Sequence, residues 1–182
     1  MKHQPEGESS KVMSDTKLTD NRIKNFHKVT TYLYRGSQPS VDEFSSLKKL
    51  GVNTVVTFRW NKRLIELEAQ HCEKNNLNLI SIPLNYVNPP RVEDIVKFVR
   101  IIDDKDNHAV YVHCLHGVDR TGIMVAFYRI IRHNWTVDQA YKEMEVCGFH
   151  KYRLRPFKWK LFKFADYIAK HREEFEPFRE DE

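Results

Sequence analysis

The chain has 182 residues, of which 41% are hydrophobic and 30% charged, and its formal net charge is +5. This length predicts a single domain with its own hydrophobic core, and because no apolar run reaches about 18 residues we expect no membrane-spanning helix. The cysteines, Cys72, Cys114 and Cys147, follow neither a disulfide framework nor a zinc motif, so we expect reduced thiols in a cytoplasmic protein without a bound metal. An export leader that had already been cleaved would leave no trace in this sequence.

Composition and charge divide the chain into three segments. Residues 1–20 are polar and lack hydrophobic periodicity, which predicts a flexible N-terminal arm. Residues 21–170 are expected to form the single domain. Residues 171–182 hold six acidic residues against two arginines, which predicts an acidic C-terminal tail and leaves the rest of the chain with a net charge of +9. A body of this charge attracts anionic partners.

Hydrophobic periodicity predicts strands that alternate with helices along the domain. Ser40 and Glu43 form a capping-box pattern for the first helix, and Thr136 and Gln139 form one for a later helix. The predicted strands cover residues 32–34, 52–58, 78–84 and 109–112, and the predicted helices cover residues 40–50, 62–75, 92–102, 123–132, 137–147 and 156–169. This alternation indicates an α/β fold with a mostly parallel central sheet flanked by helices.

The most informative motif is the run from His113 to Gly122, which links a predicted strand to a predicted helix. Cys114 and Arg120 bracket its loop with five residues between them. A loop of this length at a helix N-terminus lets backbone N–H groups converge into a nest that binds an anion such as phosphate. That environment favours a thiolate, since cysteines at helix N-termini have pKa values of roughly 3.5–7.5 against ~8.5 for the free residue. The sequence therefore predicts Cys114 as a nucleophile.

Other side chains of the run suit a bound phosphoryl group. Arg120 offers a planar fork of donors for two phosphoryl oxygens, and Thr121 can place its hydroxyl near the Cys114 sulfur. The competing interpretation is a buried cysteine in an ordinary turn, because cysteine is often a small core residue. The predicted phosphate-binding loop consists of Leu115, His116, Gly117, Val118, Asp119 and Arg120.

The run His-Cys-Leu-His-Gly-Val-Asp-Arg-Thr-Gly at 113–122 resembles the signature loop His-Cys-x5-Arg-Ser/Thr-Gly of the cysteine-dependent protein tyrosine phosphatase superfamily. The order of the segments 33–39, 55–59 and this loop is similar to that of small bacterial dual-specificity-type phosphatases, and the resemblance covers residues 30–165. It implies a protein tyrosine phosphatase-like fold of the dual-specificity type.

The resemblance also implies a reaction without metal or cofactor. Cys114 would attack phosphorus, a phosphocysteine would form, and water would hydrolyse it. Arg120 and the loop N–H groups would stabilise the charge on the equatorial oxygens. His113 would orient and polarise the loop, although a histidine that ends a strand is also a common satisfied core residue.

The general acid departs from the superfamily pattern. There an aspartate on a separate loop protonates the leaving group, and segment 84–90 resembles that loop in tensin-type phosphoinositide phosphatases. Tyr86 stands where the aspartate is expected, and a phenol with an unperturbed pKa of ~10 is a poor acid at neutral pH. Asp119, placed before the arginine as in myotubularin-type and Sac-type loops, is the first replacement and His116 the second. Alternatively, Asp119 only shapes the loop.

Ligands of parallel sheets bind beyond the carboxyl ends of the strands, so we expect a pocket where three strand ends converge. We expect a phosphorylated substrate to bind there. The preferred class is a phosphotyrosine or dual-specificity substrate, whose aryl group would lie against aromatic side chains such as Tyr86, Tyr152 and Trp60. The alternative is an inositol polyphosphate, as in cysteine phytases of the superfamily, or a phosphoinositide, held by rim cations. The predicted substrate rim consists of Arg59, Lys62, Arg63, Tyr86, Arg91, Lys151 and Arg153.

We expect a monomer that binds no nucleic acid. Two other functional classes compete with the phosphatase prediction. A rhodanese-like sulfurtransferase also carries a cysteine on a strand-to-helix loop, but its loop does not usually show the complete motif, and thiosulfate turnover would identify it. A phosphate-binding module without catalysis would explain the missing acid, although both Cys114 and Arg120 are present.

Overall fold

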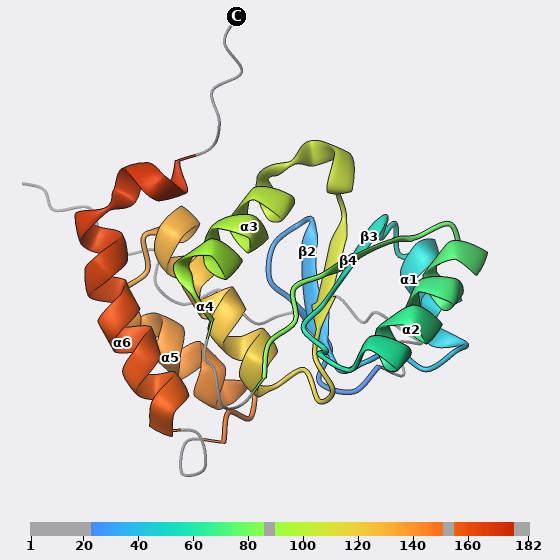
Figure 1. Ribbon diagram of the computed structural model, residues 1–182, viewed down its shortest axis with the longest axis horizontal. Helices are drawn as coiled ribbons and strands as arrows, with labels where there is room; N and C mark the ends of the chain where they lie inside the picture. Colours follow the sequence, from blue (N-terminus) through green and yellow to red (C-terminus); the bar gives the residue numbers. More distant parts are fainter. Residues whose placement is uncertain (1–22, 86–89, 151–154, 177–182) are drawn as a thin grey trace, which may run out of the picture.

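The computed structural model describes residues 23–85, 90–150 and 155–176. At its centre is a five-stranded sheet with the strand order β1-β2-β5-β3-β4, seen nearly edge-on in Figure 1. β1 pairs antiparallel with β2, and the other neighbouring strands are parallel. The strands are β1 (His27–Lys28), β2 (Leu33–Gly36), β3 (Thr54–Thr57), β4 (Asn78–Ser81) and β5 (Val110–His113). The predicted mostly parallel α/β fold is confirmed.

Helices cover both faces of the sheet (Figure 1). α1 (Glu43–Lys49) and α2 (Lys62–Lys74) pack on one face, where Tyr111 and Cys72 join a smaller apolar cluster. The opposite face carries the larger core, which includes Val110, Val112 and Cys114. Its helices are α3 (Val92–Asp103), α4 (Asp119–His133), α5 (Val137–Val146) and α6 (Arg155–Lys170). Alternate residues of β5 therefore face the two helical layers.

The structure differs from the predicted elements in several places. β3 covers Thr54–Thr57 and not residues 52–58, β4 ends at Ser81 and not at residue 84, and α1 begins at Glu43 and not at residue 40. β1 was not predicted, because a two-residue strand leaves no periodic signal. Arg35 and Gly36, predicted as a turn, extend β2 because they pair with Val112 and His113 of β5. α4 begins at Asp119 and not at residue 123, because Gly122 N–H already donates to Val118 O at 2.8 Å.

Of the two predicted capping boxes, one forms in full and the other in part. The box at the start of α5 forms in full, with Thr136 and Gln139 exchanging hydrogen bonds of 2.8 and 3.2 Å. At α1 only half of the box forms: the backbone N–H of Ser40 donates to Glu43 Oε2 at 2.7 Å, and the helix begins at Glu43.

The chain after α6 packs against the body through residue 176. A single turn, η2 (Arg172–Phe175), follows α6, and Phe175 is buried in the larger core. Arg132 of α4 donates to the carbonyl oxygen of Phe175 and pairs with Asp103 at 2.6 Å. The first residues of the segment predicted as an acidic tail thus belong to the packed structure. Among the described helices, none has the length and apolar character needed to cross a membrane.

Candidate active site

The loop from Cys114 to Val118 leaves the end of β5 and enters α4 at Asp119. The carbonyl oxygens of Leu115 and Gly117 are held from outside the loop. Gln38 N–H donates to Leu115 O at 3.1 Å, and Arg35 Nη2 and Asn25 Nδ2 donate to Gly117 O at 2.9 and 3.0 Å. Since the N–H of a peptide points opposite to its C=O, carbonyls fixed outward turn amide groups toward the interior of the loop, as an anion nest requires.

Gly117 lets the loop approach the end of β2. Its φ is +69°, and a Cβ there would lie 2.2 Å from the carbonyl carbon and oxygen of Gly36. Both the left-handed backbone and the close approach require glycine. The phosphate-binding loop and the β2 end are therefore packed backbone to backbone.

Cys114 is 2% exposed. Burial alone would raise the pKa of its thiol, but the hydroxyl and backbone N–H of Thr121, the Arg120 guanidinium and the backbone N–H of His116 outweigh burial and lower that pKa. In contrast, burial raises the pKa of Cys147, and burial with the nearby Glu68 carboxylate raises the pKa of Cys72 to about 12. Of these thiols, Cys114 is the one whose surroundings favour the thiolate.

Arg120 lies in the first turn of α4 and is 2% exposed. Its Nη1 donates to Phe58 O at 3.1 Å and to Leu84 O at 3.2 Å. These carbonyls follow β3 and β4, so the guanidinium is oriented by the ends of two strands while the cysteine loop follows a third. The predicted convergence of three strand ends is confirmed.

His113 is buried at the end of β5. Its Nδ1 lies 2.9 Å from the carbonyl oxygen of Cys114, and its Nε2 lies 2.5 Å from Oε1 of Glu68 on α2. The two side chains are 0% and 1% exposed. His113 is thus a core residue with polar partners, and it also contacts the loop directly. The two interpretations drawn from the sequence, a core histidine and a histidine that orients the loop, therefore both apply.

Asp119 is 3% exposed and is engaged by the connection between α5 and α6. Its Oδ1 accepts the backbone N–H of His150 at 3.0 Å, and its Oδ2 lies 2.9 Å from Nδ1 of the same histidine. Gly148, with φ +91°, brings this connection against the Val118 side chain. The His150 side chain is half exposed.

Four side chains that support the loop were not predicted from the sequence: Asn25, Arg35, Glu68 and His150. Arg35 stood in a segment quoted for the family resemblance but was taken as part of a turn. Glu68 left a usable signal, an acid one turn before Cys72 on the buried face of α2. Asn25 and His150 left none, because only the folded chain brings them to the loop.

The predicted rim is partly described. Arg59 contacts the Gln38 side chain, whose backbone binds the loop. Lys62 and Arg63 are exposed at the start of α2. Arg91, at the start of α3, is paired with Asp94 at 3.4 Å and Glu93 at 3.8 Å. Tyr86, Lys151 and Arg153 lie outside the described residues, as does Tyr152.

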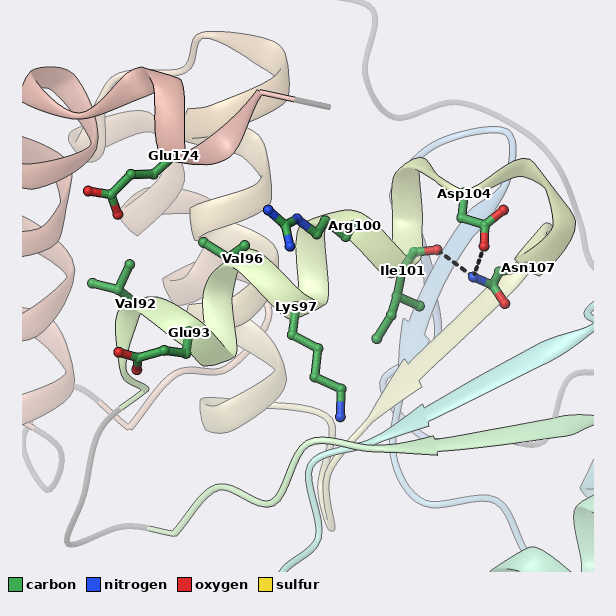
Figure 2. A pocket seen from close by; sticks show the side chains of 9 residues that line it. All are labelled: Val92, Glu93, Val96, Lys97, Arg100, Ile101, Asp104, Asn107 and Glu174. Carbon is green, nitrogen blue, oxygen red and sulfur yellow. Dashed lines mark hydrogen bonds between the residues drawn. The ribbon is translucent and has the colours of Figure 1, made fainter. Parts of the chain in front are cut away.

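Two apolar side chains are exposed in this region. Trp60, after β3, is 59% exposed, and Leu115, within the loop, is 42% exposed. A separate pocket lies along α3 (Figure 2), and its lining mixes acidic and basic side chains from α3, the following turn and η2, among them Glu93, Lys97 and Glu174. It includes no residue of the cysteine loop. A pocket at the strand ends stays a prediction.

Comparison with known proteins identifies the family. A family model described as a DSP-PTPase phosphatase fused to NAD+ kinase (PTP-NADK) matches residues 10–159. The chain belongs to this family. The predicted relation to cysteine-dependent, dual-specificity-type phosphatases is thereby confirmed.

Relatives of this chain include a dual specificity phosphatase and an inositol diphosphatase. The dual specificity protein phosphatase TpbA of Pseudomonas aeruginosa is 28% identical over 128 residues, which cover 69% of this chain and 55% of TpbA. The inositol diphosphatase DSP5 of Arabidopsis thaliana is 24% identical over 139 residues, 74% of this chain and 67% of DSP5. The match thus spans little more than half of TpbA.

Solved structures share the fold. The crystal structure of P. aeruginosa TpbA superposes with a TM-score of 0.71 at 23% identity, covering 85% of this chain and 94% of that chain. The core catalytic domain of the PP-IP phosphatase SIW14 from S. cerevisiae gives a TM-score of 0.65 at 19% identity, with 86% and 98% covered.

Proposed function

We propose that this chain hydrolyses phosphate monoesters through a phosphocysteine on Cys114. The observation that carries the proposal is a buried cysteine whose thiol pKa is lowered, at the start of a loop whose carbonyls are fixed outward and whose end is the N-terminus of α4. Membership of a phosphatase family supports the same reaction.

In the proposed reaction the Cys114 thiolate attacks phosphorus, so that an S–P bond forms while the P–O bond to the leaving group breaks. Arg120 and the inward amides stabilise the charge of the phosphoryl oxygens, the electrostatic contribution that dominates phosphoryl transfer. Water then attacks phosphorus, releases inorganic phosphate and returns the thiolate. Thr121, whose hydroxyl lowers the thiol pKa, favours the thiolate at the start and as the leaving group.

The contacts of Asp119 favour the shaping role over the acid role. Both its oxygens face His150, and one of them also accepts a backbone N–H. A carboxylate with these partners ties the connection between α5 and α6 to the first turn of α4. We therefore propose that Asp119 shapes the loop, and that the leaving-group proton comes from His116, Tyr86 or solvent.

For the substrate, we propose a phosphotyrosine or dual-specificity phosphoprotein. The exposed Trp60 and Leu115 provide apolar surface for an aryl group, and between Cys114 and Arg120 the loop carries an aspartate and no lysine or arginine. The relative TpbA, named a dual specificity phosphatase, supports this class. An inositol polyphosphate is the alternative, supported by the relative named inositol diphosphatase and by the exposed Lys62 and Arg63.

A substrate panel tests this proposal. Phosphotyrosyl peptides, phosphoinositides and inositol hexakisphosphate are compared by phosphate release, with Cys114→Ser as the control for contaminating activity. We expect the highest kcat/KM on the phosphotyrosyl peptides and none from Cys114→Ser, which lacks the nucleophile. A preference for inositol hexakisphosphate would select the alternative, and turnover of all three by Cys114→Ser would refute the covalent route.

A further inference from the structure

His113 and Glu68 form a buried pair behind the cysteine loop. The carbonyl oxygen of Cys114 can only accept, so Nδ1 of His113 must carry the hydrogen that lies between them at 2.9 Å. On the other side of the ring, Nε2 meets a carboxyl group at 2.5 Å. The two side chains are thus in ion-pair contact inside the core, and these atoms have no other polar partner among the described residues.

The thiol and phenol that face this pair carry no charge at neutral pH. Cys72 on α2 and Tyr111 on β5 face the pair; burial and Glu68 raise the pKa of Cys72 to about 12, and burial raises that of Tyr111 well above its ordinary value. The other ionisable groups acting on Tyr111 are Glu43 of α1, Cys114 and Arg35 of β2. A buried carboxylate without a partner is costly, so Glu68 and His113 hold each other in place.

The position of the pair links α2 to the nucleophile. Tyr111 and His113 lie two residues apart in β5 and so face the same side of the sheet, where α2 packs. Cys114, the next residue, belongs to the core of the opposite side. A contact from α2 therefore reaches the Cys114 peptide through the His113 ring, from behind the loop.

We propose that Glu68 is a positioning residue for the nucleophile: it holds the His113 ring so that Nδ1–H fixes the carbonyl oxygen of Cys114 and, with it, the first peptide of the phosphate-binding loop. The role of this pair in turnover rests on the proposed function. Its effect on the arrangement of the loop does not rest on that function, because the reactivity of the Cys114 thiol can be measured without turnover.

The experiment replaces Glu68 by side chains of similar size. Glu68→Met removes the polar contact and keeps the volume, while Glu68→Gln keeps a group whose amide donates to a neutral Nε2. Glu66→Met, an exposed site on the same helix, is the matched control. The rate of iodoacetamide alkylation is measured across a range of pH. Peptide mass spectrometry then gives the pH midpoint of Cys114 alkylation separately from that of Cys72 and Cys147.

We expect Glu68→Met to melt at a lower temperature than the wild type, because removing one partner of a buried pair leaves His113 without its partner. Alkylation is therefore read well below that melting temperature. The Cys114 alkylation midpoint of this variant should rise by about one pH unit, since a displaced loop loses a hydrogen bond to the thiolate. Its kcat should fall by about 10²-fold, the cost of misplacing a reacting group by about 1 Å. Glu68→Gln should restore the midpoint and bring kcat to within about tenfold of the wild-type value.

Two results would overturn the proposal: a Cys114 alkylation midpoint in Glu68→Met equal to that of Glu66→Met, or a shift of that midpoint and a loss of kcat that are the same in Glu68→Met and Glu68→Gln. If Glu68→Met does not fold, Glu68→Asp replaces it, because the shorter carboxylate keeps the charge but withdraws from the ring, and the same shift is expected. Alkylation needs no turnover, so a chain that hydrolyses no phosphate ester would refute the proposed function and leave this test intact.

Discussion

At the scale of single residues, the reactivity of Cys114 depends on opposing effects on the pKa of its thiol. Burial disfavours its thiolate, while hydrogen bonds from Thr121 and His116 and the charge of Arg120 favour it and prevail. Because the pKa is lowered, the thiolate persists to a lower pH than an ordinary thiol allows, and it is lost only when the pH falls through that lowered value. Cys72 lacks such donors and is held as a thiol by burial and Glu68.

Asp119→Asn distinguishes a shaping residue from a general acid. If Asp119 shapes the loop through His150, the variant should slow activated aryl phosphates and alkyl phosphates alike, by about tenfold, and lower the melting temperature. A general acid would instead cost about 10²–10⁴-fold on poor leaving groups and spare activated ones. The measurement is kcat/KM across a series of esters with different leaving-group pKa values.

His150→Ala is the matched variant for this prediction. It removes the ring that contacts Asp119 while leaving the carboxyl group in place, so it should reproduce the uniform loss seen in Asp119→Asn. A leaving-group dependence that changes in Asp119→Asn and stays intact in His150→Ala would return the acid role to Asp119.

Residues close in sequence were the easier ones to predict. Cys114 and Arg120 lie in one run, and the five residues between them were enough to predict a phosphate-binding loop with a nucleophilic cysteine. The supports of that loop come from β2, α2 and the connection after α5, so their pairing exists only after folding. Glu68 is the instructive case, because an acid on the buried face of a helix signals a buried partner without identifying it.

At the scale of elements, the junction of β2 with the cysteine loop determines the shape of the nest. Gly117→Ala would place a Cβ against the backbone of Gly36 and strain a positive φ. We expect a stability loss of about 1–3 kcal/mol, with a fall in kcat of about 10²-fold because the loop must move. Thermal unfolding and steady-state kinetics measure the two effects.

Gly51→Ala supplies the control for that prediction. Gly51 also has a positive φ, +88°, but nothing lies within 4 Å of the added Cβ, so this variant should lose stability through strain alone and keep kcat. An equal effect on kcat in both variants would mean that backbone strain, and not contact with Gly36, controls the loop.

Element boundaries show where sequence patterns reach their limit. Hydrophobic periodicity located each helix, but it placed the start of α4 four residues late, because the first turn of this helix contains the motif residues Asp119 and Arg120. Arg35 was predicted in a turn, yet it continues β2 with a buried side chain that binds the loop. In both cases the pattern failed at a segment that supports the site.

At the scale of the whole molecule, the parallel sheet brings distant segments to one edge. Carbonyl groups after β3 and β4 orient Arg120, while the loop after β5 carries Cys114. The alternation of strands and helices was sufficient to predict this convergence, because the carboxyl ends of parallel strands meet at the same edge. Of the predicted substrate rim, Arg59, Lys62, Arg63 and Arg91 lie among the described residues, and Tyr86, Lys151 and Arg153 lie outside them.

Trapping the covalent intermediate tests the central claim most directly. The protein is mixed with an aryl phosphate, quenched within the first turnover and digested, and the phosphate is located by peptide mass spectrometry. The account predicts up to one phosphate per chain on Cys114, and none in Cys114→Ser. Phosphate on His113 or His116, or a burst of inorganic phosphate with no phosphorylated peptide, would contradict it.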